Sequence, residues 1–260
     1  MVSIDRATNM VLKYAINDRL EEMDFYVDDV VNREYVSFND VEHVNSFFIN
    51  NIDNMYNNYN YEELSDLRYY TGTSFKEVNA ILRNNWTYEV NGELTKEKQT
   101  NYRVMASNIS GIINSKGTEL NSNILVYRGV SISAFKNFGV NILADLISLK
   151  GQYVYDSGFV STSLIRSKSF FDRQLDYHEP CNIEIEYLIP NESADGVPLI
   201  NTELSYNSNE QTEYLINSGN LSKVVDVVYD DVNNKAYVKM VYIPKKVWDL
   251  SYRKDNEKNL

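Results

Sequence analysis

The residue pattern changes once along the chain, from helix-like spacing of apolar side chains to strand-like segments. In the first part, apolar residues recur three or four positions apart between polar and turn-forming residues. This spacing places apolar side chains on one face of a helix. It predicts helices over residues 4–24, 39–56, 62–69, 73–82 and 96–115.

Strand-like segments rich in β-branched and aromatic residues follow. The short polar segment 231–234 separates the last two of them and favours a hairpin. Because helices come first and strands later, the sequence predicts an α+β fold instead of alternating βαβ units. The predicted strands are 124–127, 158–163, 182–188, 224–229 and 236–242.

Size and charge limit the organisation of the chain and its partners. Its 260 residues can hold one large domain or a domain with a helical appendage. We expect a helical N-terminal region at 1–58, a main domain at 59–250 and a charged tail at 251–260. The net charge of −12 argues against a nucleic-acid partner, which needs clustered basic residues. A single cysteine, Cys181, excludes an internal disulfide framework and a Cys-rich metal site.

Membrane and export signals are not evident in the sequence. No stretch approaches the roughly 20 apolar residues that a membrane span needs. The first residues lack the apolar run and cleavage site of a secretory signal peptide. We expect a protein that stays inside the cell, leaves by another route, or has already been processed.

Three short motifs follow one another: Tyr-Arg-Gly at 127–129 and Ser-Thr-Ser at 161–163 each close a predicted strand, and Gln-Thr-Glu at 211–213 enters a further short strand-like segment, 214–216. The arginine ends an apolar strand, where a guanidinium needs an anionic partner, either a bound phosphate or a structural ion pair. No glycine fingerprint of a dinucleotide-binding fold accompanies the motifs. In this order they resemble the Arg-Ser-Glu class of bacterial mono-ADP-ribosyltransferase toxins, and most closely the clostridial Rho-modifying exoenzymes. The resemblance covers roughly residues 62–247.

The resemblance implies a mainly antiparallel two-sheet β core, NAD as substrate and no metal. It makes residues 59–250 the catalytic domain and implies catalytic roles for Arg128, Ser161, Gln211 and Glu213. Cleavage of the bond between nicotinamide and ribose develops positive charge, which a positioned carboxylate stabilises. By resemblance that carboxylate is Glu213, oriented by Ser161, while Arg128 binds the pyrophosphate.

Further NAD contacts are implied by two other segments. Asn79 and Arg83 lie four residues apart on one helix face, like a pair that family members use on NAD, although a surface arginine with an incidental neighbour is the alternative. Phe170 and Arg173 match a loop whose ring stacks on nicotinamide, with Phe171 as the alternative ring. The implied cofactor-binding set is Arg128, Gly129, Asn79, Arg83, Ser161, Thr162, Phe170 and Arg173.

The acceptor is indicated by the residue two positions before the catalytic glutamate. In this class a glutamine there accompanies modification of asparagine in Rho-type GTPases, and a glutamate accompanies modification of arginine. The position holds Gln211, which favours asparagine, but Glu210 beside it leaves arginine open. The family aromatic residue three before the glutamine is replaced by Ser208, and the nearest aromatic residue is Tyr206. The expected acceptor-recognition residues are therefore Gln211, Glu210 and Tyr206.

The sequence thus predicts a toxin or effector that transfers ADP-ribose from NAD to a host protein, with a small GTPase as the favoured partner. We expect a monomer that is secreted or delivered into the host cytosol, with a carrier or delivery partner as a further option. An arginine-specific transferase (for example on actin), an NAD glycohydrolase and a non-catalytic phage-associated module are the alternatives.

Overall fold

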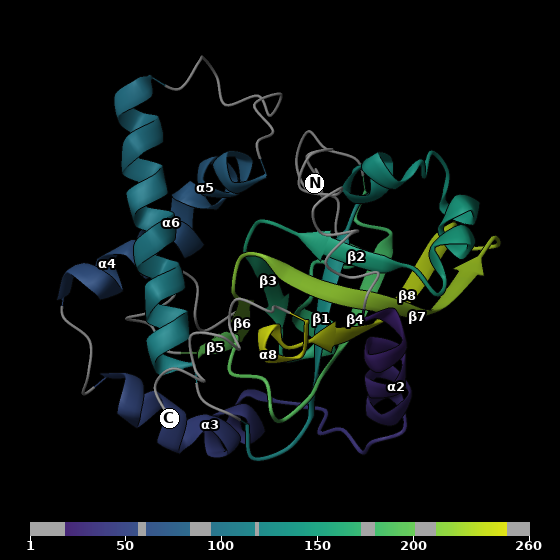
Figure 1. The fold of residues 1–260 in the computed structure, drawn as a ribbon, viewed down its shortest axis with the longest axis horizontal. Coiled ribbons are helices and arrows are strands. Elements are labelled where there is room, and N and C mark those ends of the chain that lie inside the picture. The colour runs from purple at the N-terminus through teal and green to yellow at the C-terminus, as the bar shows by residue number, and fades with distance from the viewer. Residues whose placement is uncertain are drawn as a thin grey trace.

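The computed structural model describes residues 19–56, 61–83, 95–117, 120–172, 180–200 and 212–248. Helices come first and strands later, which confirms the predicted α+β order (Figure 1). The α-helices are α2 (Leu20–Val31), α3 (Val41–Tyr56), α4 (Tyr61–Tyr69), α5 (Phe75–Leu82), α6 (Lys96–Lys116) and α8 (Lys245–Trp248). The other helical turns are a π-helix, η1 (Tyr70–Ser74), and the 3-10 helices η2 (Ile132–Phe138), η3 (Leu143–Leu149) and η4 (Arg166–Lys168).

Eight described strands form one sheet in the order β2-β7-β8-β4-β1-β3-β6-β5. All neighbouring strands are antiparallel except β4 and β8, which are parallel. The strands are β1 (Ile124–Val130), β2 (Tyr153–Asp156), β3 (Val160–Ser163), β4 (Ile183–Ile189), β5 (Gly196–Leu199), β6 (Glu213–Ile216), β7 (Asn220–Asp230) and β8 (Lys235–Ile243).

The pairing between β1 and β3 is the shortest in the sheet. The two strands are paired only at Tyr127 and Ser163, whereas β1 pairs with β4 along its whole length. The five strands from β2 to β1 and the three strands from β3 to β5 are therefore joined through a single residue pair. A division into two separate sheets, which the resemblance implied, is not confirmed, because this pair makes the hydrogen bonding continuous.

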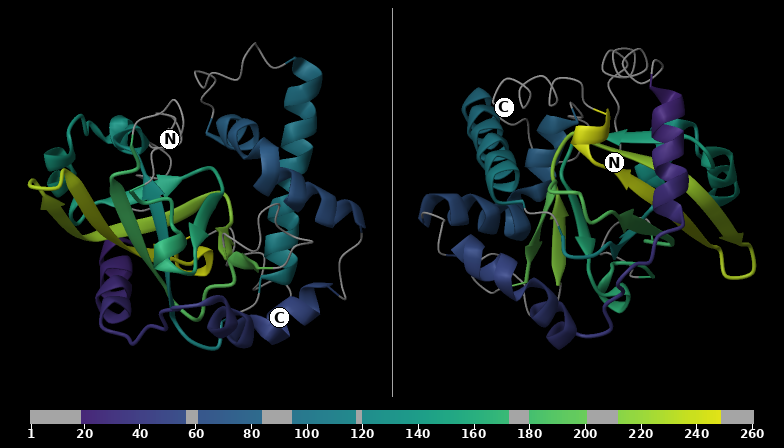
Figure 2. Two further views of the ribbon diagram at one scale, coloured as in Figure 1. Left: turned by 180° about the vertical axis from the view of Figure 1, so that it is seen from behind. Right: turned by 60° about the horizontal axis from the view of Figure 1, so that its bottom comes forward.

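Helices cover the sheet on more than one side (Figure 2). Helices α4 to α6 pack on the β5 and β6 end, where Val78 and Ile109 share a cluster with Leu215. Helix α2 packs elsewhere, with Val27 against Val241 of β8. A third cluster joins both parts of the sheet to α3, η2 and η3. Burial of these apolar faces is the main stabilising contribution to the fold.

The predicted elements match the described ones closely. Helices α3 to α6 and the β7–β8 hairpin are confirmed within a few residues. Of the first predicted helix, residues 4–18 lie outside the described ranges, and the described α2 continues to Val31. Strands β2 and β5 were not predicted, since each has four residues and β5 contains Gly196 and Pro198.

The domain boundaries stay a prediction. Helices α2 and α3 both share apolar clusters with the sheet, so the described part of the N-terminal region packs on the main body. Within the described ranges, no helix is long and apolar enough to cross a membrane.

Candidate active site

Glu213 begins β6, a four-residue strand that lies between β3 and β5. In the antiparallel pairing Ser163 lies opposite Glu213, and Ser161 lies opposite Leu215. Because side chains alternate along strands and directly opposed residues share a face, Ser161, Ser163 and Glu213 lie on one face. This is the face that Leu215 uses to pack against α4 to α6.

The carboxyl of Glu213 is buried, with 5% of the residue exposed. Burial raises the pKa of Glu213 to about 7, although the hydrogen bond with Ser161 and the charge of Arg128 act in the opposite direction. Loss of water around the ionised form is therefore the dominant influence on the pKa of Glu213. The carboxyl changes charge near neutral pH.

The turn before Glu213 has an unusual backbone. Thr212 is fully buried and has a φ of 32°, in the left-handed region that β-branched residues rarely adopt. Its carbonyl oxygen accepts a hydrogen bond of 2.9 Å from the amide of Leu164. Such local strain persists only where the surroundings hold it, and it is common at functional sites.

A hydrogen-bonded chain connects helix α5 to Glu213. The side-chain amide of Asn79 donates to the Tyr70 hydroxyl at 3.0 Å, and its oxygen accepts from the Phe159 amide at 2.8 Å. Tyr70 also hydrogen-bonds Ser161, which in turn hydrogen-bonds Glu213. Tyr70 was not predicted as a site residue and is one of 21 tyrosines in the chain.

Arg83 forms a buried ion pair with Asp156 at the end of β2. Its Nε and Nη2 atoms each donate to one carboxylate oxygen, both at 2.7 Å. Burial alone raises the pKa of Asp156, but the charge and hydrogen bonds of Arg83, together with the charge of Arg128, hold it below its usual value. The sequence analysis missed Asp156, because Asp-Ser-Gly at 156–158 is also an ordinary turn sequence.

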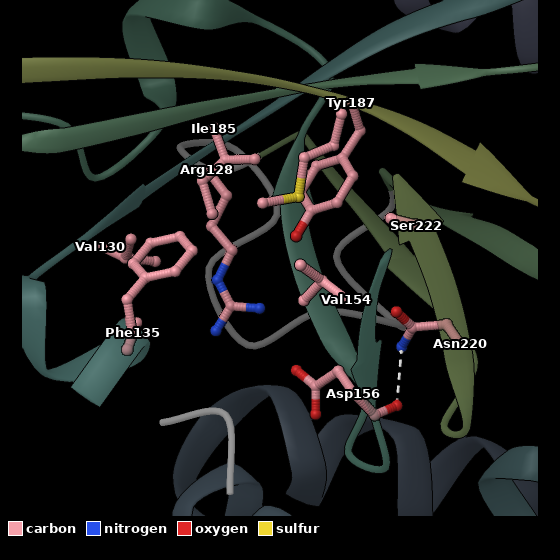
Figure 3. Close-up of a pocket in the computed structure, with 11 residues that line it drawn as sticks. Arg128, Val130, Phe135, Val154, Asp156, Ile185, Tyr187, Asn220 and Ser222 are labelled. Atoms are coloured by element: carbon pink, nitrogen blue, oxygen red, sulfur yellow. Dashed lines mark hydrogen bonds between the residues drawn. The ribbon is translucent and has the colours of Figure 1, made fainter. Parts of the chain in front are cut away.

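Arg128 lies on β1 and points into a pocket that Asp156 also lines (Figure 3). Tyr187 directs its hydroxyl into the same pocket, and Asn220 donates to the backbone oxygen of Asp156 at 3.3 Å. Within the described part of the chain, the Arg128 guanidinium has no hydrogen-bond partner. A guanidinium in this state can bind a planar or tetrahedral anion through several donors.

The loop after β3 lies directly over β1. A side chain at Gly129 would place its Cβ 2.0 Å from the Phe171 nitrogen, so only glycine fits under this backbone. The ring of Phe171 packs against Tyr237 with a centroid distance of 5.5 Å, whereas Phe170 is 36% exposed. Phe170 is therefore the more exposed of the two rings.

Other predicted site residues lie apart or beyond the described ranges. Thr162 is buried, and its hydroxyl donates to the Tyr214 carbonyl at 2.6 Å, on the sheet face opposite Ser161. The predicted residues outside the described ranges are Arg173, Tyr206, Glu210 and Gln211.

The described site thus combines a buried carboxyl that titrates near neutral pH with nearby arginines. Such a carboxylate can stabilise developing positive charge, while a guanidinium binds an anionic group of the same ligand. Among the described residues, no cluster of three or more metal-ligating side chains was found.

Comparisons with known proteins agree with this geometry. The ADP-ribosyltransferase exoenzyme family model matches residues 44–244. The match defines the class of protein as an NAD-dependent ADP-ribosyltransferase. The chain belongs to the ADP-ribosyltransferase exoenzyme family. No curated protein matches it in sequence.

Solved structures share the fold at low sequence identity. C3stau2 from S. aureus, solved with NAD, is 19% identical with a TM-score of 0.62, over 82% of this chain and all (100%) of that one. The Clostridium limosum C3 exoenzyme is 16% identical with a TM-score of 0.63, over 81% and 98% of the two chains. The ADP-ribosylating toxin BECa of C. perfringens, solved with NADH, is 19% identical with a TM-score of 0.61, over 81% of this chain and 50% of its own.

Proposed function

We propose that this protein is a mono-ADP-ribosylating toxin or effector that cleaves NAD and transfers ADP-ribose to a side chain of a host protein. The observation that carries the proposal is the buried Glu213 carboxyl, hydrogen-bonded by Ser161 on the same sheet face and close enough to Arg128 for their charges to interact. A carboxylate with one fixed hydrogen bond and a nearby guanidinium suits a ligand that is anionic at its phosphates and becomes cationic at its ribose.

The proposed mechanism assigns each group one task. Arg128 binds the NAD pyrophosphate, because its guanidinium has no hydrogen-bond partner among the described residues. Glu213, in its ionised form, faces the ribose carbon that loses nicotinamide and stabilises the oxocarbenium-like cation. Phe170, with Arg173 nearby in sequence, supplies a ring for the nicotinamide. The acceptor side chain then attacks the ribose carbon and loses a proton.

Asn79 and Arg83 contribute on the α5 side of the proposed NAD site. Asn79 holds Tyr70 at 3.0 Å, and Tyr70 contacts Ser161, so this amide supports the residue that orients Glu213. Gly129 lets the loop of Phe170 approach β1. Thr162 holds β3 to β6 through its 2.6 Å hydrogen bond with the Tyr214 carbonyl.

We further propose an asparagine of a Rho-type GTPase as the acceptor. Gln211 lies two residues before Glu213, and an amide can both donate to and accept from an acceptor amide. Glu210 gives a carboxylate that suits an arginine acceptor if the loop is shifted by one residue, and Tyr206 is the nearest aromatic contact. This protein would act in the host cytosol after secretion or delivery, as a monomer, with or without a carrier.

Labelled NAD and host-cell lysate test the proposal. The wild-type chain is expected to label a host protein, and Glu213→Gln to abolish the labelling while it still binds NAD. Mass spectrometry of the labelled protein then identifies the residue: asparagine supports the Rho-type acceptor, and arginine supports the alternative. Nicotinamide release without any labelled protein contradicts transfer and indicates a glycohydrolase, and absence of both NAD binding and cleavage indicates a non-catalytic module.

A further inference from the structure

A single carboxylate lies between two arginines that the proposed function places near NAD. Asp156 is 6% exposed and binds Arg83 through both oxygens, while Arg128 lines the same pocket and lowers its pKa through charge. The cost of burying these charges is offset only when geometry and hydrogen bonds are nearly complete. The site therefore contains a buried ion pair, which is costly to desolvate, where two apolar side chains could pack instead.

The ion pair connects helix α5 to the turn between β2 and β3. Besides its two bonds to Arg83, the Asp156 carboxylate accepts from the Gly158 amide at 2.8 Å, which fixes the turn. A Cβ at Gly158 would lie 2.7 Å from Arg83 Nε and 2.8 Å from the side-chain oxygen of Asn79. Helix α5 thus packs directly on this turn, and the position of the Asn79 side chain depends on the position of the turn.

The same turn begins the strand that carries the catalytic hydroxyl. Phe159 donates its amide to Asn79, and Ser161 follows two residues later on the same face of β3. Asn79 also holds Tyr70, which hydrogen-bonds Ser161. A shift of the Asp156 turn would therefore move both contacts that place Ser161 beside Glu213.

We propose that Asp156 is a positioning residue of the NAD-cleaving site, acting through Arg83 and the β2–β3 turn on the placement of Ser161 and Glu213. The inference rests on the proposed function. In this role Asp156 does not contact NAD, so its loss impairs the chemical step and leaves substrate binding nearly unchanged. If Asp156 served instead to reduce the attraction of Arg83 and Arg128 for the pyrophosphate, its loss would change the affinity for NAD.

The test is the steady-state kinetics of nicotinamide release by the full chain carrying Asp156→Asn, which keeps the shape of the side chain and removes its charge. We expect kcat to fall by about ten- to a hundredfold, as small misplacements of catalytic groups do. We expect KM for NAD to change by less than about threefold. A KM that changes tenfold with an unchanged kcat, or unchanged values of both, overturns the proposal.

A second variant keeps the test decisive if Asp156→Asn does not fold. Arg83→Lys keeps the charge but cannot form the bidentate pair with Asp156, so a similar loss of kcat is expected. Where both variants fold, their double mutant should lose no more than the worse single mutant, because both break one pair. An Arg83→Lys variant with an unchanged kcat would overturn the proposal, whatever its KM.

Asp226→Asn is the matched control, because it breaks an exposed ion pair with Lys150 far along the sheet. Its kinetics should equal those of the wild type. An inactive wild-type chain contradicts the proposed function itself. An active wild type with an unaffected Asp156→Asn variant contradicts only the positioning role.

Discussion

The hydroxyl of Ser161 and the carboxyl of Glu213 are hydrogen-bonded on one face of the β3–β6 pair, where Glu213 is almost completely buried. Without this bond and the charge of Arg128, burial would raise the pKa of the carboxyl further above its present value of about 7. The protonation state of Glu213 is thus a balance between desolvation and two weaker favourable contacts.

Activity should depend on pH near neutrality. Because the ionised carboxylate is the form proposed to stabilise the cation, kcat/KM for NAD should rise with pH, with a half-maximal value near the pKa of Glu213, about 7. Ser161→Ala removes a contact that lowers this pKa, so the rise should move to higher pH. The measurement is nicotinamide release across pH 5 to 9. Ser148→Ala, which removes an exposed hydroxyl in η3, is the control. A Ser161→Ala profile that moves to lower pH would contradict this account.

Stability should respond to pH in the opposite sense. The folded protein holds the Glu213 proton more tightly than the unfolded chain, with a pKa raised from 4.5 to about 7. The resulting stabilisation is complete below pH 4.5 and is lost as pH rises through 7. Glu213→Gln stays neutral, so its free energy of unfolding relative to wild type should increase over this interval by on the order of 1–3 kcal/mol.

Urea unfolding of Glu213→Gln and wild type at several pH values measures this difference. The exposed Glu42→Gln variant on α3 should show no comparable change with pH. A constant difference between Glu213→Gln and wild type from pH 4.5 to 8 would rule out a buried carboxyl at this position.

Gly129→Ala should disturb the loop that carries Phe170. Its Cβ would lie 2.0 Å from the Phe171 nitrogen, and backbone cannot move as a flexible side chain can. We expect a loss of about 1–3 kcal/mol in the free energy of unfolding and a raised KM for NAD. Gly111→Ala is the control, because no atom beyond the neighbouring backbone of its own helix lies within 4 Å of the added Cβ, and alanine there should stabilise helix α6 by about 0.5–1 kcal/mol. Equal effects of the two substitutions would refute the close approach.

Gln211→Glu should change the modified residue from asparagine to arginine. A carboxylate two residues before Glu213 can orient and deprotonate a guanidinium, whereas it cannot donate to an acceptor amide. Mass spectrometry of labelled acceptor proteins measures the change. Glu210→Gln should leave asparagine as the acceptor. If wild type modifies arginine and Glu210→Gln abolishes it, the one-residue shift of the loop is the correct description.

Local sequence pattern was sufficient to predict most helices and strands and to identify the order of the motifs. Helix α6 and the β7–β8 hairpin were predictable, because periodicity and turn residues act over a few positions. The placement of Arg128, Ser161 and Glu213 on strands was predictable for the same reason, although β1 continues past Arg128 to Val130 instead of ending there. Strand β2 was not, because four residues between a 3-10 helix and a turn carry no clear period.

The sequence alone determined the order of the arginine, serine and glutamate motifs, from which their role in cleaving NAD was predicted by resemblance. Only the tertiary structure decided that Arg83 pairs with Asp156 across 73 positions and that Tyr70 contacts Ser161. Ion pairs and hydrogen bonds between distant segments depend on how helices pack on the sheet, and no spacing rule encodes that packing. The raised pKa of Glu213 has the same origin, because burial is a property of the folded chain.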